Sequence, residues 1–525
     1  MLEQLHSQLA TFKSCADPLR FHAAHSPDAP ATAFQKRITT YAQLHSRSNR
    51  IAQALLADGV RSAERIAILA KNSDIFFELN YACWKVDAVL VPVNFRLAPP
   101  EMVGIINDSQ ATMLFVDDAF ADVAHEMLTE LDKIRTVVAL GEAQQDWPQF
   151  ESWYNAHNDE DPGIEVDPSN TCMQLYSSGT TGLPKGAELT HEAFLALMQV
   201  ALQDWDDWGK NEVVMVAMPL FHVAGCEWGY LGYTIGGLNV VMPEVDPAQI
   251  LHDIEAYKVT QTLFVPAVIL FLLQHPNCAT TDFSSIKNIY YGASPIPMPL
   301  LEQAVETMGC GFAQLYGLTE TTGAITYLAP QDHDGSERMR SCGKPIRSAE
   351  IRVIDEQGNP CAPGEVGEII CRSIQNMKGY WQKPADTASA IRDGWFYSGD
   401  AGYFDAEGYL YVHDRIKDMI ISGGENIYPA EIESALASHP AIADVAIIGV
   451  PDEKWGESVK AVIVLKESAS LSEAELEEYS RERLAGYKIP RSMDLIDALP
   501  RNPSGKILKR VLREKYWSGK DRQVN

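Results

Sequence analysis

The sequence lacks paired cysteines and long hydrophobic runs. Its nine cysteines are scattered singly with no C-x-x-C motif, a pattern that fits a reduced cytosolic protein and argues against a zinc site. The longest apolar stretch, residues 263–273, has 11 residues and includes a proline, whereas a bilayer span needs roughly 18. The beginning of the chain also lacks a basic start followed by an apolar run. We therefore expect a cytoplasmic protein with no secretory signal and no integral membrane segment.

Basic residues are scarce as well. The chain has 43 Lys and Arg against 71 Asp and Glu, which gives a net charge of -28. Such a charge opposes nucleic acid and anionic membranes as main partners. An anionic ligand would have to be held by local backbone N–H groups and a few lysines.

Strand and helix patterns alternate along most of the chain. Short β-branched runs occur at 65–70, 88–93, 112–116, 136–140, 213–218, 239–242, 262–265 and 286–291. This alternation predicts βαβ units and largely parallel sheets that are covered on both faces. Thr190 is expected to cap the helix that follows it.

The pattern changes after residue 346. Runs at 350–355, 367–371 and 408–412 predict a small β-rich subdomain. A compact unit follows, with helices expected at 429–436 and 472–484 and strands at 445–450 and 460–465; Ser472 and Glu475 form a capping-box pattern. The predicted fold class is α/β, with a large N-terminal domain over 1–416 and a small mobile C-terminal α+β domain over 417–525.

Glycines and hydroxyls crowd one stretch, Tyr176-Ser-Ser-Gly-Thr-Thr-Gly-Leu-Pro-Lys-Gly186. Glycine lets backbone N–H groups approach a ligand closely, and such loops bind phosphate. The stretch is not a Walker loop, because Pro184 precedes Lys185 and Gly186 follows it. Taken alone, it would be a phosphate loop or an ordinary glycine-rich surface turn.

This stretch resembles the signature of the adenylate-forming superfamily of acyl- and aryl-CoA synthetases, adenylation domains and luciferases. The companion motifs of that superfamily follow in order: Pro219-Leu-Phe-His222, Gly292-Ala-Ser294, Tyr316-Gly-Leu-Thr-Glu320, Tyr397-Ser-Gly-Asp400, Asp414-Arg-Ile-Lys-Asp418, Ser422-Gly-Gly-Glu-Asn426 and Pro503-Ser-Gly-Lys506. The resemblance runs from about residue 20 to 515. It implies an acid–CoA ligase that uses ATP, Mg²⁺ and coenzyme A. A small-molecule carboxylic acid would become an acyl-adenylate and then a thioester, with release of pyrophosphate and AMP.

The resemblance also implies roles for single residues. The phosphates of ATP would contact the loop residues Ser177, Ser178, Gly179, Thr180, Thr181, Gly182 and Lys185, with Thr319 at the α-phosphate. Glu320 and Thr180 would hold Mg²⁺, a hard cation that prefers oxygen ligands. The adenosine would lie between Tyr316, with Gly317 beside it, and the turn formed by Gly292, Ala293 and Ser294. Asp400 and Arg415 would bind the ribose hydroxyls.

Chemistry and domain movement are assigned to a few further residues by the same resemblance. Lys506 would bridge the substrate carboxylate and the α-phosphate, where two anions must approach each other. Lys417 stands at the hinge between the domains, where many relatives have aspartate. Gly423 and Gly424 would leave room for the pantetheine arm of CoA. His222 would gate or orient the adenylate, unless it is an ordinary core histidine.

The acid itself is less well defined. The expected pocket residues are apolar or small: Met218, His222, Val223, Ala224, Trp228, Tyr291, Gly292 and Gly317. They predict an apolar acid, either a medium- or long-chain fatty acid or an aryl acid. Trp228 and Tyr291 would shorten the pocket if they face inwards and would admit a long chain if they face away.

Three other functions are compatible with parts of the pattern. One is a stand-alone adenylation enzyme that loads a carrier-protein thiol, although no carrier region follows the lysine motif. Another is a luciferase-like oxygenase, although the ending Asp521-Arg-Gln-Val-Asn lacks a peroxisomal Ser-Lys-Leu. The third is a nucleotide-binding protein without activity, which Lys506 argues against. A homodimer, common among relatives, stays open.

Overall fold

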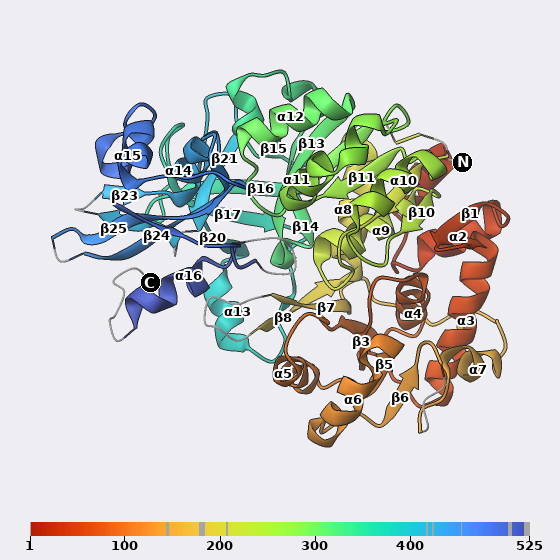
Figure 1. Ribbon diagram of the computed structural model, residues 1–525. Helices are drawn as coiled ribbons and strands as arrows, with labels where there is room; N and C mark the ends of the chain where they lie inside the picture. The colour runs from red at the N-terminus through yellow and green to blue at the C-terminus, as the bar shows by residue number, and fades with distance from the viewer. Residues whose placement is uncertain are drawn as a thin grey trace.

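The computed structural model, shown in Figure 1, describes most of the chain. The described residues are 2–142, 146–177, 184–205, 208–209, 211–415, 418–422, 425–452, 454–501 and 507–518. Four sheets organise them.

The largest sheet has nine strands. In order across the sheet they are β15 (Lys344–Pro345), β14 (Gly323–Leu328), β13 (Gly311–Leu318), β12 (Asn288–Gly292), β11 (Gln261–Phe264), β9 (Val213–Val216), β10 (Leu238–Val241), β1 (Pro30–Phe34) and β2 (Arg37–Thr40). The strands from β13 to β1 pair in parallel, and the strands outside them are antiparallel.

The second large sheet has seven strands. They are β18 (Gly379–Tyr380), β8 (Lys185–Thr190), β7 (Thr171–Ser177), β4 (Val89–Pro92), β3 (Arg65–Leu69), β5 (Met113–Val116) and β6 (Thr136–Ala139). The last five are parallel. Every residue of β3 is buried, as expected for a central strand that is covered on both faces. The predicted α/β class with parallel-rich sheets is confirmed.

Helices cover both sheets. Between them lie α4 (Asp74–Lys85), α8 (His191–Asp204) and α9 (Val223–Thr234); α4 contacts strands of both sheets, and α9 contacts the nine-stranded one. The other helices of this part are α1 (Leu2–Leu9), α2 (Asp17–His25), α3 (Tyr41–Ala57), α5 (Pro99–Ser109), α6 (Ala121–Met127), α7 (Phe150–Asn155), α10 (Pro247–Tyr257), α11 (Pro266–Gln274) and α12 (Met298–Met308).

Aromatic packing joins α4 to α9 at the centre of the core. The rings of Trp84 and Tyr230 lie 4.5 Å apart between centroids, and Phe77 meets Tyr230 edge-on at 5.4 Å. Both arrangements are favourable for aromatic pairs. As predicted, Thr190 caps α8, with its side chain accepting from Ala193 N. The ring contacts pack α9, which carries several predicted site residues, against α4.

Two smaller sheets follow. The first contains β16 (Ala349–Ile354), β17 (Gly367–Ser373), β20 (Trp395–Phe404), β19 (Ile391–Arg392) and β21 (Leu410–Arg415), with α13 (Pro384–Ala390) beside it. The last contains β23 (Glu425–Ile427), β22 (Ile420–Ser422), β25 (Gly456–Leu465), β24 (Ile442–Asp452) and β26 (Ser492–Leu495), packed with α14 (Pro429–Leu436), α15 (Glu473–Arg481) and α16 (Lys509–Trp517). Ser472 and Glu475 form the expected capping box of α15.

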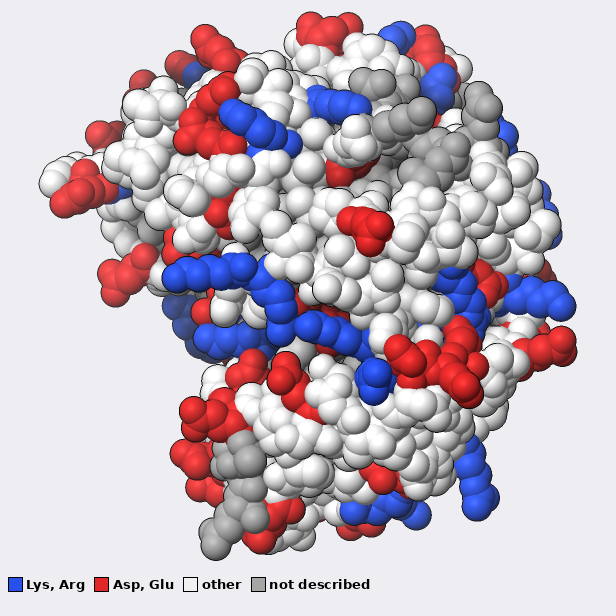
Figure 2. Space-filling model, turned by 90° about the vertical axis from the view of Figure 1, so that its right-hand side faces the viewer, with Lys and Arg blue, Asp and Glu red and all other residues white. Residues whose placement is uncertain are grey.

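The last sheet and its helices form the blue unit at one side of Figure 1. A boundary between residues 416 and 417 stays a prediction, because both residues lie outside the described ones. Within the described ranges, no helix is long and apolar enough to cross a membrane. Figure 2 shows one face of the molecule, where basic side chains form a band that acidic side chains flank on both sides.

Candidate active site

The two ends of the glycine- and hydroxyl-rich stretch lie on neighbouring antiparallel strands. Ser177 ends β7, Lys185 begins β8, and the two residues pair in antiparallel register. The predicted phosphate contacts between them, Ser178, Gly179, Thr180, Thr181 and Gly182, lie outside the described residues. The hairpin nevertheless fixes where the ends of the stretch lie.

Glu320 joins this hairpin to the nine-stranded sheet. It belongs to η4 (Thr319–Thr321), a short 3-10 helix between β13 and β14, and is 8% exposed. Its Oε1 accepts hydrogen bonds from Ser177 Oγ at 2.8 Å and from the Tyr380 hydroxyl at 2.9 Å. Its Oε2 makes no hydrogen bond to the described part of the chain. A carboxylate held by one oxygen beside the hairpin, with Thr319 next to it, fits the ligand set of a hard cation.

Lys185 is held by protein groups. Its Nζ forms an ion pair with Asp386 in α13 and lies 5.3 Å from the ring centroid of Tyr380. The lysine therefore ties β8 to the segment that carries Tyr380. A contact between Lys185 and a nucleotide stays a prediction.

The predicted adenosine residues come together from two sheets. The Tyr316 hydroxyl on β13 donates to Asp400 Oδ2 on β20 at 2.8 Å. Asp400 is 5% exposed, and its backbone amide donates to Ser398 Oγ at 3.0 Å. Arg415 is the register partner of Asp400 on β21; its side chain lies outside the described residues.

The predicted turn at 292–294 lies beside Tyr316, because Gly292 pairs with Leu315 across parallel strands. A Cβ atom at Gly292 would lie 2.1 Å from the backbone oxygen of Leu315, so only glycine fits. Ala293 has a φ of +64°, a left-handed conformation that is uncommon for a residue other than glycine. Ser294 follows this turn. Gly317 is equally confined, because a Cβ atom there would lie 1.9 Å from Gly323 O.

His222 stands at the start of α9 as its N-cap. Its Nδ1 accepts a hydrogen bond from Ala224 N at 3.3 Å. Burial lowers the pKa of His222 to about 4. The histidine is thus a neutral capping group near pH 7, and a role in orienting the adenylate stays a prediction.

The predicted pocket residues divide between two faces. Val223 and Ala224 are the first two residues of α9, and Met218 precedes the helix, with its backbone oxygen accepting from the Asn72 side chain at 3.0 Å. Trp228 is buried, its Nε1 donates to Met215 O, and its ring lies 4.9 Å from that of Tyr290. Tyr291 points elsewhere, since its hydroxyl hydrogen-bonds His333 Nε2 at 3.0 Å.

Successive side chains on a strand point to opposite faces. Tyr290 therefore shares the α9 side with Trp228, whereas Tyr291 faces His333 and Phe312. Trp228 packs inside an aromatic group with Trp208, at 5.9 Å, rather than standing alone. The predicted pocket groups Trp228 with Tyr291. In the structure Trp228 of α9 contacts Tyr290, whereas Tyr291 points to the opposite face of β12, so the two predicted residues lie on different sides of this strand.

The C-terminal site residues Lys417, Gly423, Gly424 and Lys506 lie outside the described residues. Their surroundings are described. Asp418 forms an ion pair with Arg513 of α16 at 2.7 Å. A bridge between Arg501 and Ile507 brings together the two ends of the segment that carries Lys506.

Two residues near the site escape sequence-based prediction. Tyr380 donates to Glu320 across 60 residues, and no sequence signal marks it. Glu227 is a buried acid inside the apolar sequence of α9. A charged residue in an otherwise apolar helix is a signal that could have been used.

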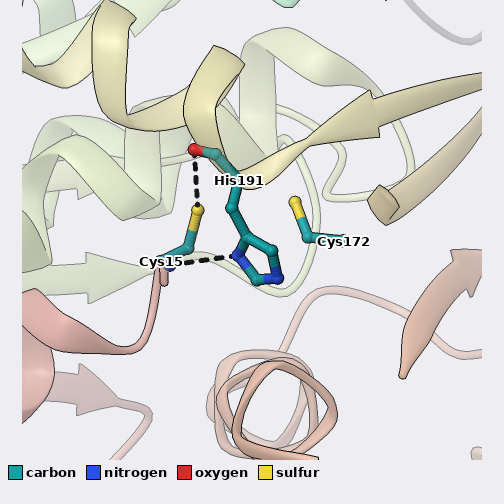
Figure 3. Close-up of side chains that lie close together, drawn as sticks. All are labelled: Cys15, Cys172 and His191. Atoms are coloured by element: carbon teal, nitrogen blue, oxygen red, sulfur yellow. Dashed lines mark hydrogen bonds between the residues drawn. The ribbon is translucent and has the colours of Figure 1, made fainter. Parts of the chain in front are cut away.

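One buried group has side chains of the types that bind metals. Figure 3 shows His191 between Cys15 and Cys172, all three buried. His191 Nδ1 accepts a hydrogen bond from Cys15 N at 3.1 Å, so its lone pair is engaged. The arrangement fastens the N-terminal segment to the start of α8 and lies apart from the residues described above.

Comparison with known proteins decides the family. Residues 19–381 match the model of the AMP-binding enzyme, and residues 431–506 match the AMP-binding enzyme C-terminal domain. The chain belongs to the AMP-binding enzyme family. The predicted membership of the adenylate-forming enzymes is confirmed, and so is the enzyme class, an AMP-forming acid–thiol ligase.

Relatives of this AMP-binding enzyme cover nearly its full length. The fatty acid–[acyl-carrier-protein] ligase ScoC of Streptomyces coeruleorubidus is 40% identical, with 99% of both chains covered. The feruloyl-CoA synthase of an Amycolatopsis species is 38% identical, covering 95% of this chain and 98% of the relative. The crystal structure of the anthranilate CoA ligase AuaEII in complex with anthranoyl-AMP has a TM-score of 0.89 at 26% identity, covering 96% and 97% of the two chains.

Proposed function

We propose that this enzyme activates an apolar fatty or aryl acid with ATP and transfers the acyl group to coenzyme A. The observation that carries the proposal is the convergence of two residue sets. Ser177, Glu320 and Tyr380 meet at the hairpin, and Tyr316 meets Asp400 at the neighbouring strand ends. The two sets match the needs of a triphosphate and of an adenosine, respectively.

The chemistry has two steps. The acid carboxylate attacks the α-phosphorus of ATP, forming a C–O–P linkage while pyrophosphate leaves with its bonding electrons. The sulfur of CoA then attacks the acyl carbon, AMP leaves, and the thiol proton passes to solvent. Bound Mg²⁺ supplies positive charge to the phosphates, and Glu320 would hold it.

The residues of this chain would position the reactants. Asp400 would accept hydrogen bonds from the ribose hydroxyls, and Tyr316 would orient Asp400 while packing on the base. Lys506 would bring the two anions together and stabilise the charge that develops between them. A domain rotation at Lys417 would withdraw Lys506 before the thiol enters past Gly423 and Gly424.

A second function is favoured by one comparison. The relative at 40% identity is named for transfer to an acyl carrier protein, so the thiol could be the phosphopantetheine of such a carrier. Both thiols share the same pantetheine arm. The choice affects the thiol acceptor only, since adenylate formation is common to both functions.

Adenylate formation is tested first by ATP–pyrophosphate exchange without CoA, over a panel of fatty, aryl and short branched acids. At least one acid should support exchange, and complete inactivity with all of them would overturn the proposal. The thiol is then identified by comparing kcat/KM for CoA with that for a phosphopantetheinylated carrier protein. A higher kcat/KM for the carrier protein would identify the carrier, rather than CoA, as the thiol acceptor.

The role of Lys506 is tested by Lys506→Ala. Exchange should fall by several orders of magnitude, while thioester formation from supplied acyl-adenylate should largely survive. Lys466→Ala is the matched control, because Lys466 is exposed in the same C-terminal unit. Equal loss of both half-reactions in Lys506→Ala would contradict the division of labour.

A further inference from the structure

Glu227 is a buried acid that the proposed mechanism does not use. It lies in α9, five residues after His222, and is 7% exposed. Its carboxyl group makes no hydrogen bond or ion pair with any residue of the described ranges. Burial raises the pKa of Glu227 well above its ordinary value.

The carboxyl group is aimed at the first residue of β14. A Cβ atom on Gly323 would lie 1.8 Å from Glu227 Oε2 and 2.8 Å from Oε1, so the carboxyl occupies the place of a side chain at position 323. Gly323 has a φ of +90°, which favours glycine. Thr322 precedes it, and its buried Oγ1 likewise has no partner among the described residues. The unpaired carboxyl of Glu227 thus lies against Gly323, and the unpaired hydroxyl of Thr322 belongs to the preceding residue of the chain.

This place adjoins the predicted acid and adenosine residues. Gly317 packs directly on Gly323, since a Cβ atom on Gly317 would lie only 1.9 Å from Gly323 O. Gly317 follows Tyr316 on β13, and η4 with Glu320 ends one residue before Thr322. Glu227 therefore lies on the α9 side of the strand ends, where the acid is expected.

Two other buried acids among the described residues are ion-paired. Glu212 binds Lys287 at 2.7 Å, and Glu78 binds Arg47 at 2.8 Å. A buried carboxyl without a partner lowers stability, and an apolar side chain of similar size would avoid that cost. Packing alone would favour leucine at position 227. The presence of glutamate there indicates that its carboxyl group has a ligand as its partner.

We propose that Glu227 determines substrate specificity by hydrogen-bonding a hydroxyl group of the acid, at a position remote from the reacting carboxylate. The proposal rests on the proposed acid-activating function. A protonated carboxyl both donates and accepts, as a hydroxyl does, so the two groups are complementary. An ammonium group would require the ionised form, which burial disfavours. The substrate is then a hydroxylated aryl or fatty acid rather than a plain hydrocarbon acid.

The test compares acids that differ only in one hydroxyl, such as 4-hydroxycinnamate with cinnamate and 8-hydroxyoctanoate with octanoate. In ATP–pyrophosphate exchange, at least one hydroxylated acid should exceed its deoxy partner in kcat/KM by about tenfold or more, because an unmatched buried polar group is costly. Glu227→Leu should abolish this preference while keeping or raising Tm. Glu227→Gln, which retains hydrogen bonding, should keep part of it.

Glu212→Gln is the matched control, since it alters a buried acid that is paired with Lys287. It should lower Tm and leave the preference unchanged. Absence of any hydroxyl preference in the unaltered enzyme, or its survival in both Glu227 variants, would overturn the proposal. A preference for amino-substituted acids would contradict the proposal that Glu227 is protonated and binds a hydroxyl group. Exchange with deoxy acids alone would overturn this inference and leave the ligase function standing, whereas inactivity with every acid would remove both together.

Discussion

Replacing His222 by asparagine should remove a titration near pH 4 while leaving α9 capped. The Nδ1 of His222 accepts a hydrogen bond from Ala224 N, which requires that nitrogen to be unprotonated. The side-chain oxygen of asparagine can accept the same bond. Burial lowers the pKa of His222 from 6.5 to about 4, so the folded protein resists protonation that the unfolded chain accepts.

The size and sign of this effect follow from linkage. Because the pKa of His222 is lower in the folded state than in the unfolded chain, the contribution of neutral His222 to the free energy of unfolding is fully present above pH 6.5. It is lost as the pH falls from 6.5 through about 4. A shift of this size corresponds to about 3 kcal/mol of free energy of unfolding. His222→Asn should be free of this loss, and its stability at pH 8 should match that of the unaltered enzyme.

The assay is NMR of carbon-13-labelled histidine rings. The chain has 13 histidines, and the signal that disappears in His222→Asn identifies His222. Its midpoint should lie near pH 4, and a midpoint between 6 and 7 would refute the burial argument. His222→Ala serves as the comparison, because it also loses the cap and should be less stable by about 1 kcal/mol at every pH.

Three further predictions concern the site. Tyr316→Phe removes the donor to Asp400 and should raise KM for ATP by about tenfold or more, as for a hydrogen bond to a charged group; an unchanged KM would separate this pair from nucleotide binding. Gly323→Ala should lower Tm more than Gly309→Ala, because both glycines have positive φ but only a Cβ at 323 meets a carboxyl. Equal shifts in Tm would contradict the packing of Glu227 there. Removing divalent cations with a chelator should abolish adenylate formation, and Mg²⁺ should restore it; full activity with the chelator present would refute the magnesium proposal.

The local sequence predicts the framework well. The β-branched run at 65–70 is β3 apart from its last residue, and the run at 112–116 is β5 apart from its first residue. The caps at Thr190 and Ser472 form as expected, because a cap depends on residues three positions apart. The family resemblance assigns Tyr316 and Asp400 to the adenosine, which stays a prediction, whereas the hydrogen bond between them is a finding of the structure.

The less predictable features depend on packing between distant elements. Tyr380 reaches Glu320 only because β18 pairs with the edge of β8. The contact between the rings of Trp228 and Tyr290 depends on how α9 packs against β12. The sequence shows that Glu227 interrupts an apolar helix, but its aim at Gly323 emerges only when α9 meets β14.

The ion pair between Lys185 and Asp386 has a consequence for the synthesis of the chain. The two residues are 201 positions apart, and a ribosome adding roughly 5–20 residues per second needs about 10 to 40 seconds to pass from one to the other. Until residue 380 is added, β7 and β8 are present without Tyr380, Asp386 or Asp400. The proposed nucleotide site is therefore incomplete on the nascent chain, and we expect ATP not to assist its early folding. Contacts of such long range also close slowly, so nucleotide binding should be among the last properties that a newly made molecule acquires.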